Sequence, residues 1–101
     1  MASDAATDSI VADLADARAE IDALDHLLVE LLIRRYTVAG RIGRLKRERG
    51  LPVFDPAREA ALLARLSEQA RPPLTPDALV MIWETLLEVS RAVQEEIPAA
   101  E

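Results

Sequence analysis

The stretch VELLIRRYTVAGRIGRLK, residues 29–46, decides the fold class, because its apolar residues continue a heptad spacing that begins far upstream. Positions spaced alternately four and three residues apart carry Ile10, Leu14, Ala17, Ile21, Leu24, Leu28, Leu31, Arg35, Val38, Ile42 and Leu45. This spacing is typical of a helix that buries one apolar seam. We therefore predict one long helix over about residues 8–49.

A helix of that length has consequences for assembly. It would extend roughly 60 Å at 1.5 Å per residue, which exceeds the usual dimension of a globule of 101 residues. The remainder of the chain is too short to cover such a seam. We therefore predict that the seam pairs with a second copy of the chain.

Two proline-containing segments divide the remainder of the chain. In GLPVFDP, residues 50–56, the glycine is a plausible helix cap and Asp55-Pro56 has the residue types of an N-cap followed by a first helical position. RPPLTP, residues 71–76, ends with a similar start signal, Thr75-Pro76. The predicted fold is all-α, with one long N-terminal helix and two shorter helices, interlaced as a homodimeric helical bundle. We expect a single domain over residues 1–101 whose ends, 1–8 and 98–101, fray.

Composition excludes several classes of protein and site. The absence of cysteine excludes disulfides and thiolate metal sites, and the single histidine, His26, disfavours a histidine-built zinc site. A net charge of −6 and only one Phe, one Trp and one Tyr argue against nucleic-acid binding. The acidic N-terminus does not resemble a signal peptide, and no apolar run is long enough to span a membrane. We therefore expect a cytoplasmic protein that uses no metal and no cofactor.

Polar residues interrupt the predicted apolar faces. Arg35 occupies a seam position, and Lys46, eleven residues later, points roughly the same way. On the third predicted helix, Ser90 and Gln94 are spaced i, i+4 on a largely apolar face. Taken singly, each is more commonly a satisfied core polar group, or in the case of Arg35 a residue that sets register. Because an unpaired buried charge is costly, the set as a whole predicts an anion pocket inside a helical bundle.

Other kinds of chemistry lack their residues. Arg58 and Glu59, at the start of the second predicted helix, are by default surface ion-pairing residues, and their proximity to Asp55 adds them to the set. The sequence has no plausible Ser-His-Asp or Cys-His arrangement and no phosphate-binding glycine loop. An enzyme built on this pocket would act by holding one conformer of its substrate and stabilising developing charge.

From about residue 17 to residue 94 the chain resembles the all-helical (AroQ-type) chorismate mutases. The resemblance rests on the ordered combination of ARAEIDALD (17–25), RRYTVAGRIGRLK (34–46), DPARE (55–59) and SRAVQ (90–94). Members of this family are three-helix protomers interlaced as a homodimer, with two active sites that each draw on both chains. The resemblance implies an isomerase that converts chorismate to prephenate by a Claisen [3,3] rearrangement, in phenylalanine and tyrosine biosynthesis.

The resemblance also implies catalytic roles. Arg35 matches the arginine that binds a substrate carboxylate within its own chain, and Arg18 matches the arginine contributed to the site of the other protomer. Lys46 matches the lysine that reaches the ether oxygen and a carboxylate. Gln94 matches the second donor to the ether oxygen.

Four further residues match substrate-binding groups of the family. Asp55 and Glu59 match the groups that hold the ring hydroxyl, and Arg58 and Ser90 match further polar contacts in the pocket. Sister enzymes on this scaffold act on 4-amino-4-deoxychorismate or remove pyruvate from isochorismate, and Asp55 and Glu59 are where such a change of substrate should appear. A non-catalytic helical dimer is a third interpretation, although it does not explain polar residues on buried faces.

Overall fold

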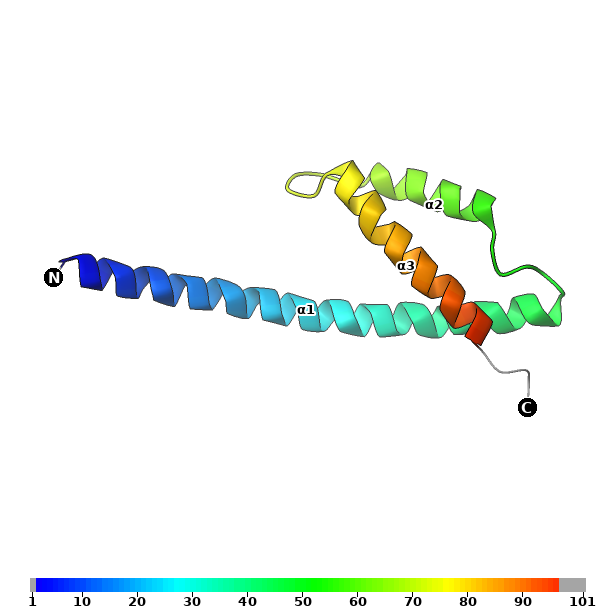
Figure 1. Ribbon diagram of the computed structural model, residues 1–101, viewed down its shortest axis with the longest axis horizontal. Coiled ribbons are helices and arrows are strands. Elements are labelled where there is room, and N and C mark those ends of the chain that lie inside the picture. The colour runs from blue at the N-terminus through cyan, green and yellow to red at the C-terminus, as the bar shows by residue number, and fades with distance from the viewer. Residues whose placement is uncertain (1, 97–101) are drawn as a thin grey trace. The chain divides into compact units, whose positions relative to one another are not determined.

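The structure is a computed structural model that describes residues 2–96, with side-chain exposure described for residues 5–96. Within those residues it consists of three helices, α1 (Ala2–Glu48), α2 (Pro56–Ser67) and α3 (Pro76–Glu96) (Figure 1). The predicted all-α fold is confirmed. α1 begins upstream of the predicted start, because its first residues are mainly alanine and aspartate, which suit a helix N-terminus. The fraying of residues 1–8 stays a prediction, and residues 98–101 lie outside the described residues.

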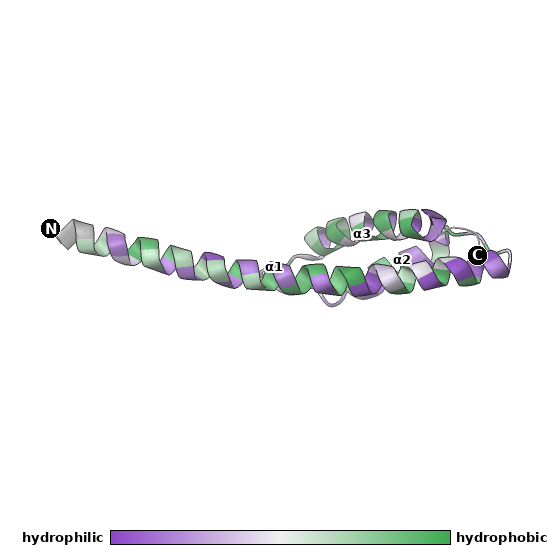
Figure 2. Cartoon of the chain, turned by 90° about the horizontal axis from the view of Figure 1, so that it is seen from below, coloured by the Kyte–Doolittle hydropathy of each residue, from purple (hydrophilic) through white to green (hydrophobic). Residues whose placement is uncertain are grey.

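The chain divides into two bodies, which are described separately: an N-terminal body, Met1–Arg35, and a C-terminal body, Tyr36–Glu101. In the described part of the N-terminal body the apolar seam is exposed, and the exposed fractions of its large side chains range from 46% at Leu14 to 66% at Ile10. Figure 2 shows hydrophobic residues recurring along this part of α1. No helix among the described residues combines the length and the apolar character needed to cross a membrane.

In the C-terminal body, α2 packs against α3, and α3 also contacts the end of α1. The Tyr36 hydroxyl donates a hydrogen bond to the Leu86 carbonyl over 3.2 Å, and Gly43 lies directly against Gln94. The contacts advance in the same order along both helices, so α3 runs in the same direction as this end of α1. The buried apolar residues of this body include Ala39, Leu79 and Leu87.

The end of α1 is a Schellman motif, which confirms the predicted cap at Gly50. Gly50 adopts φ +66°, a left-handed conformation that glycine adopts without steric cost. Its amide donates to the Arg47 carbonyl over 3.3 Å, and the Leu51 amide donates to the Lys46 carbonyl over 2.8 Å. These bonds satisfy the last carbonyls of the helix and turn the following segment back toward Lys46.

The starts of α2 and α3 follow the predicted local chemistry. The Asp55 carboxylate accepts a hydrogen bond from the Arg58 amide over 3.1 Å, and the Thr75 hydroxyl accepts one from the Ala78 amide over 3.2 Å. In each case proline follows as the first helical residue, where its missing N–H costs nothing.

Candidate active site

Lys46 and Gln94, two of the residues predicted to act together, are joined in the C-terminal body. Lys46 Nζ donates to Gln94 Oε1 over 2.9 Å and to the Val53 carbonyl over 2.7 Å. The Schellman turn at the end of α1 returns residues 51–53 to Lys46, and α3 supplies Gln94. Three separate segments therefore fix one ammonium group.

The two side chains retain unused donors. Lysine has no acceptor, so Gln94 presents its carbonyl oxygen to Lys46, which leaves its amide NH₂ as a donor for another group. An ammonium group has three N–H bonds, of which the two hydrogen bonds use two. Both acceptors are uncharged, so the positive charge of Lys46 is not neutralised by them. This arrangement can present two hydrogen-bond donors and one positive charge to an anionic or ether oxygen.

The buried face of α3 carries both predicted polar residues. Ser90 and Gln94 lie one turn apart, and their exposed fractions are 7% and 8%. A polar side chain in such a position must be hydrogen-bonded, as Gln94 is to Lys46. The prediction that both interrupt a buried face is confirmed.

Gly43 allows the backbones of α1 and α3 to approach each other at Gln94. A Cβ atom built on Gly43 would lie 2.8 Å from both the Cα and the carbonyl oxygen of Gln94, and 3.1 Å from its Cβ. The first two atoms belong to the backbone and cannot rotate away. This close approach places Gln94 beside the turn of α1 that carries Lys46.

Glu59, predicted to bind substrate, is held by an arginine that the sequence analysis did not single out. Arg91 Nη1 lies 2.5 and 2.7 Å from the two Glu59 carboxylate oxygens. The guanidinium also lies over the Phe54 ring, 5.3 Å from its centroid. The hydrogen bond to Glu59 raises the pKa of Arg91 above its ordinary value, so the guanidinium stays charged throughout any assay range. The only sequence signal for Arg91 is its position between Ser90 and Gln94, two predicted site residues.

Asp55 and Arg58 lie together at the start of α2. One Asp55 carboxylate oxygen caps the helix through the Arg58 amide, and both side chains are exposed. Glu59 follows one turn after Asp55, and its amide donates to the Asp55 carbonyl over 3.1 Å. The structure thus brings together three of the predicted substrate-binding residues on one helical turn.

Arg18 and Arg35 belong to the N-terminal body. Arg18 is exposed and Arg35 is partly buried, although the seam residues around it are largely exposed. Their contributions to the site stay predictions.

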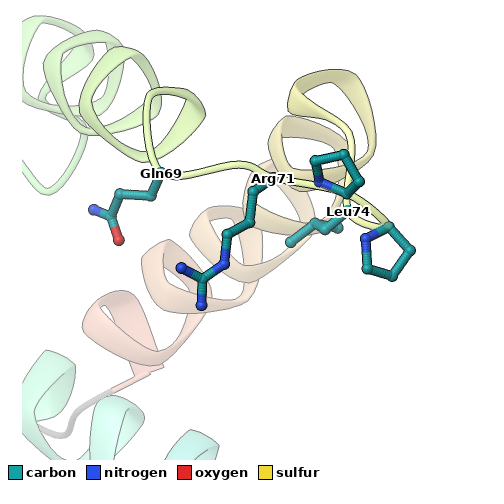
Figure 3. A pocket seen from close by; sticks show the side chains of 5 residues that line it. Gln69, Arg71 and Leu74 are labelled. Atoms are coloured by element: carbon teal, nitrogen blue, oxygen red, sulfur yellow. The ribbon is translucent and has the colours of Figure 1, made fainter.

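The connection between α2 and α3 forms an open pocket, and none of the residues that line it is a predicted site residue. It is lined by Gln69, Arg71, Pro72, Pro73 and Leu74, and Figure 3 shows the side chains around it. All five belong to the connection between the two helices. This pocket is therefore not the candidate site.

Comparisons with known proteins agree with this arrangement. Residues 17–95 match the family model for chorismate mutase type II. The chain is 32% identical to the T-protein of Haemophilus influenzae over 87% of its length, and it spans 24% of that protein. The similar solved structures include two chorismate mutases. The chorismate mutase (Form II) of Thermus thermophilus has a TM-score of 0.81 and 28% identity, over 85% of this chain and 98% of that one. The chorismate mutase of Helicobacter pylori in complex with prephenate has a TM-score of 0.77 and 37% identity, over 83% and 91%. The chain therefore belongs to the chorismate mutase type II family.

Proposed function

We propose that the protein is a chorismate mutase that rearranges chorismate to prephenate, on the route to phenylalanine and tyrosine. The observation that carries this proposal is the hydrogen bond between Lys46 Nζ and Gln94 Oε1, which sets a cation and an amide donor side by side. Membership of the family supports it, as does the prephenate bound to the Helicobacter pylori relative. A cytoplasmic location belongs to the same proposal.

The rearrangement requires that the substrate be held in one conformer and that developing charge be stabilised, and it needs no nucleophile. The ether C–O bond of chorismate breaks while a new C–C bond forms within the same molecule, so no proton, electron or co-reactant is exchanged. The substrate must be held in a chair-like, diaxial conformer, and holding one conformer supplies much of the rate enhancement. Partial negative charge develops on the ether oxygen as the C–O bond lengthens.

Lys46 and Gln94 are the donors to that oxygen. The remaining N–H of Lys46 and the amide NH₂ of Gln94 would both donate to it, and Lys46 would also attract a carboxylate. Because the Val53 carbonyl and α3 already fix these groups, little reorganisation accompanies the reaction. A primary amide donates at any pH, so the chemical step should vary little around neutral pH.

The other predicted residues would bind the rest of the substrate. Arg35 would bind one carboxylate through the planar fork of its guanidinium. Asp55 and Glu59 would accept a hydrogen bond from the ring hydroxyl. Arg58 and Ser90 would make further polar contacts in the same pocket.

The site would be completed by a second copy of the chain, with Arg18 reaching into the partner's site. Arg18 and Arg35 are seventeen residues apart, roughly 25 Å along one helix, too far for both to hold one small molecule from the same chain. The exposed seam of the N-terminal body supports a dimer, because residues such as Ile21 and Leu24 are more than half exposed in a single chain.

The test is direct. The purified protein is incubated with chorismate, the ultraviolet absorbance of chorismate is followed, and the product is identified by chromatography and mass. We expect conversion to prephenate. A folded dimer that leaves chorismate unchanged would contradict the proposal, and 4-amino-4-deoxychorismate and isochorismate would be tried next.

A further inference from the structure

The mechanism above uses Glu59 but gives no role to its ion pair with Arg91. The ion pair joins α3 to α2 across 32 residues of sequence. The Arg91 guanidinium also lies over the ring of Phe54, the residue before the N-cap of α2. The exposed fractions of the two side chains are 31% and 20%, so the pair is sheltered but still reached by solvent. Arg91 lies three residues before Gln94 on α3, which places the pair on the neighbouring helical turn.

Glu59 keeps the capacity to bind a second donor. A carboxylate offers about four acceptor positions, and Arg91 contacts the two oxygens through a single nitrogen, Nη1. One oxygen atom can therefore still accept a hydrogen bond from a ligand hydroxyl. Arg91 fixes where that acceptor points.

The charge of Arg91 decides which ligand group suits this position. A donor on the far side of the carboxylate would lie on the order of 5 Å from the guanidinium, two hydrogen-bond lengths away. A neutral hydroxyl can donate a hydrogen bond to this carboxylate, and it loses little binding free energy because Arg91 already balances the negative charge. A protonated amine meets the same balanced carboxylate together with a nearby positive charge, which disfavours it.

We propose that Arg91 is a positioning and specificity-determining residue, which orients Glu59 and balances its charge so that the site accepts a neutral ring hydroxyl and rejects an ammonium group. This inference rests on the proposed function, because Glu59 is taken to face the ring substituent. It assigns to one side chain the choice between chorismate and its 4-amino analogue.

The experiment compares Arg91→Met, Arg91→Lys and Arg91→Gln in the full chain. For each protein, kcat and KM are measured with chorismate, and 4-amino-4-deoxychorismate is used as a competitor to obtain its inhibition constant. Arg65→Met is the matched control, because it removes an exposed arginine from α2. Circular dichroism and sedimentation verify that each variant is a folded dimer.

The expected result is a pair of opposite shifts. Arg91→Met raises the KM for chorismate about five-fold and lowers the inhibition constant of the amino compound about five-fold, as befits a partly exposed ion pair. Arg91→Lys restores both values toward those of the wild type. Arg91→Gln can still donate to Glu59 without a charge, so it keeps KM near the wild-type value and lowers only the inhibition constant. Arg65→Met changes neither value.

Two results would overturn the inference. If KM and the inhibition constant move in the same direction, or if neither moves, Arg91 has only a structural role or none. A failure of the proposed function has a different signature, since the wild-type protein would then not convert chorismate at all. With wild-type turnover present and the opposite shifts missing, only the role of Arg91 is lost.

Discussion

The N-terminal and C-terminal bodies differ in how much of their own structure they can support. In the C-terminal body, buried leucines, helix caps and long-range hydrogen bonds hold α2, α3 and the end of α1 together. In the N-terminal body, the side chains from Ala5 to Leu31 are exposed, including every seam residue up to that point. The C-terminal body resembles a small folded unit, whereas the described part of the N-terminal body is a single helix with exposed side chains.

The difference indicates which part of the proposed active site forms within one chain and which part requires two. An isolated helix gains little stability in water without a packed apolar face, so we expect the N-terminal body to pair with a second copy. The C-terminal body sets the Lys46–Gln94 pair within one chain. Each proposed site would thus combine a part that forms in one chain with a part that needs two, and the predictions below separate these parts.

The largest effect is expected from a charge in the seam. Leu28→Asp should abolish the dimer and reduce turnover below detection, because a carboxylate buried between two helices is strongly unfavourable. Sedimentation velocity and the chorismate assay measure both outcomes. Ala19→Asp, an exposed position facing away from the seam in the heptad, is the control. If Leu28→Asp remains an active dimer, the seam is not the subunit contact.

Arg35→Leu should separate assembly from catalysis. The dimer should persist, or gain stability, because an apolar residue replaces a charge in the seam, while kcat/KM should fall about 10³-fold. Arg35→Lys should restore little, because an ammonium group cannot replace a planar fork. The neighbouring exposed arginine provides the control, Arg34→Leu. Full turnover by Arg35→Leu would remove this residue from the site.

Gln94→Glu tests the part of the site that one chain sets. A carboxylate donates to the ether oxygen only when protonated, and Lys46 would lower the pKa of that carboxyl. At pH 7 we expect kcat to fall about 10²-fold. Its pH profile should rise toward acid, whereas the wild-type profile stays nearly flat from pH 6 to about pH 8. Gln69→Glu, exposed between α2 and α3, is the control. A flat profile for Gln94→Glu would argue against a donor role for Gln94.

Gly43→Ala should give the smallest effect and the most specific one. The new methyl group would meet backbone atoms of Gln94 at 2.8 Å, so α3 must shift away from α1. We expect kcat to fall about ten-fold, since small displacements of a donor are costly in rate, and stability to fall by about 1 kcal/mol.

The control for this variant is Ala61→Gly, at an exposed position of α2, which loses about 1 kcal/mol of helix stability without touching Gln94. Chemical denaturation and steady-state kinetics compare the two. If both variants lose stability but neither loses kcat, the close approach at Gly43 does not position Gln94.

Helix boundaries were predictable where local chemistry decides them. The caps at Asp55 and Thr75, the prolines that follow them and the left-handed Gly50 are all readable from neighbouring residues, and each was confirmed. The start of α1 was placed too late. Its first turns precede Ile10, where the apolar heptad pattern begins, so only residue preferences mark them, and these are a weaker guide.

The site was predictable in its members and less so in its contacts. Ser90 and Gln94 were recognised as polar residues on an apolar face, and both are buried. The ion pair between Arg91 and Glu59 was missed, because its partners lie 32 residues apart and meet only through the packing of α2 on α3. Such pairs require tertiary structure, which the spacing of residues along one helix cannot supply.

The turn that ends α1 has a consequence for the order in which the protein folds. Lys46 is fixed by two kinds of partner: the Leu51 amide and the Val53 carbonyl, five and seven residues away, and Gln94, 48 residues away. Contacts between near neighbours form in well under a microsecond, whereas distant ones must wait for chain closure. We expect the ammonium group to be tethered as soon as α1 ends, so that α3 docks onto a lysine already in place.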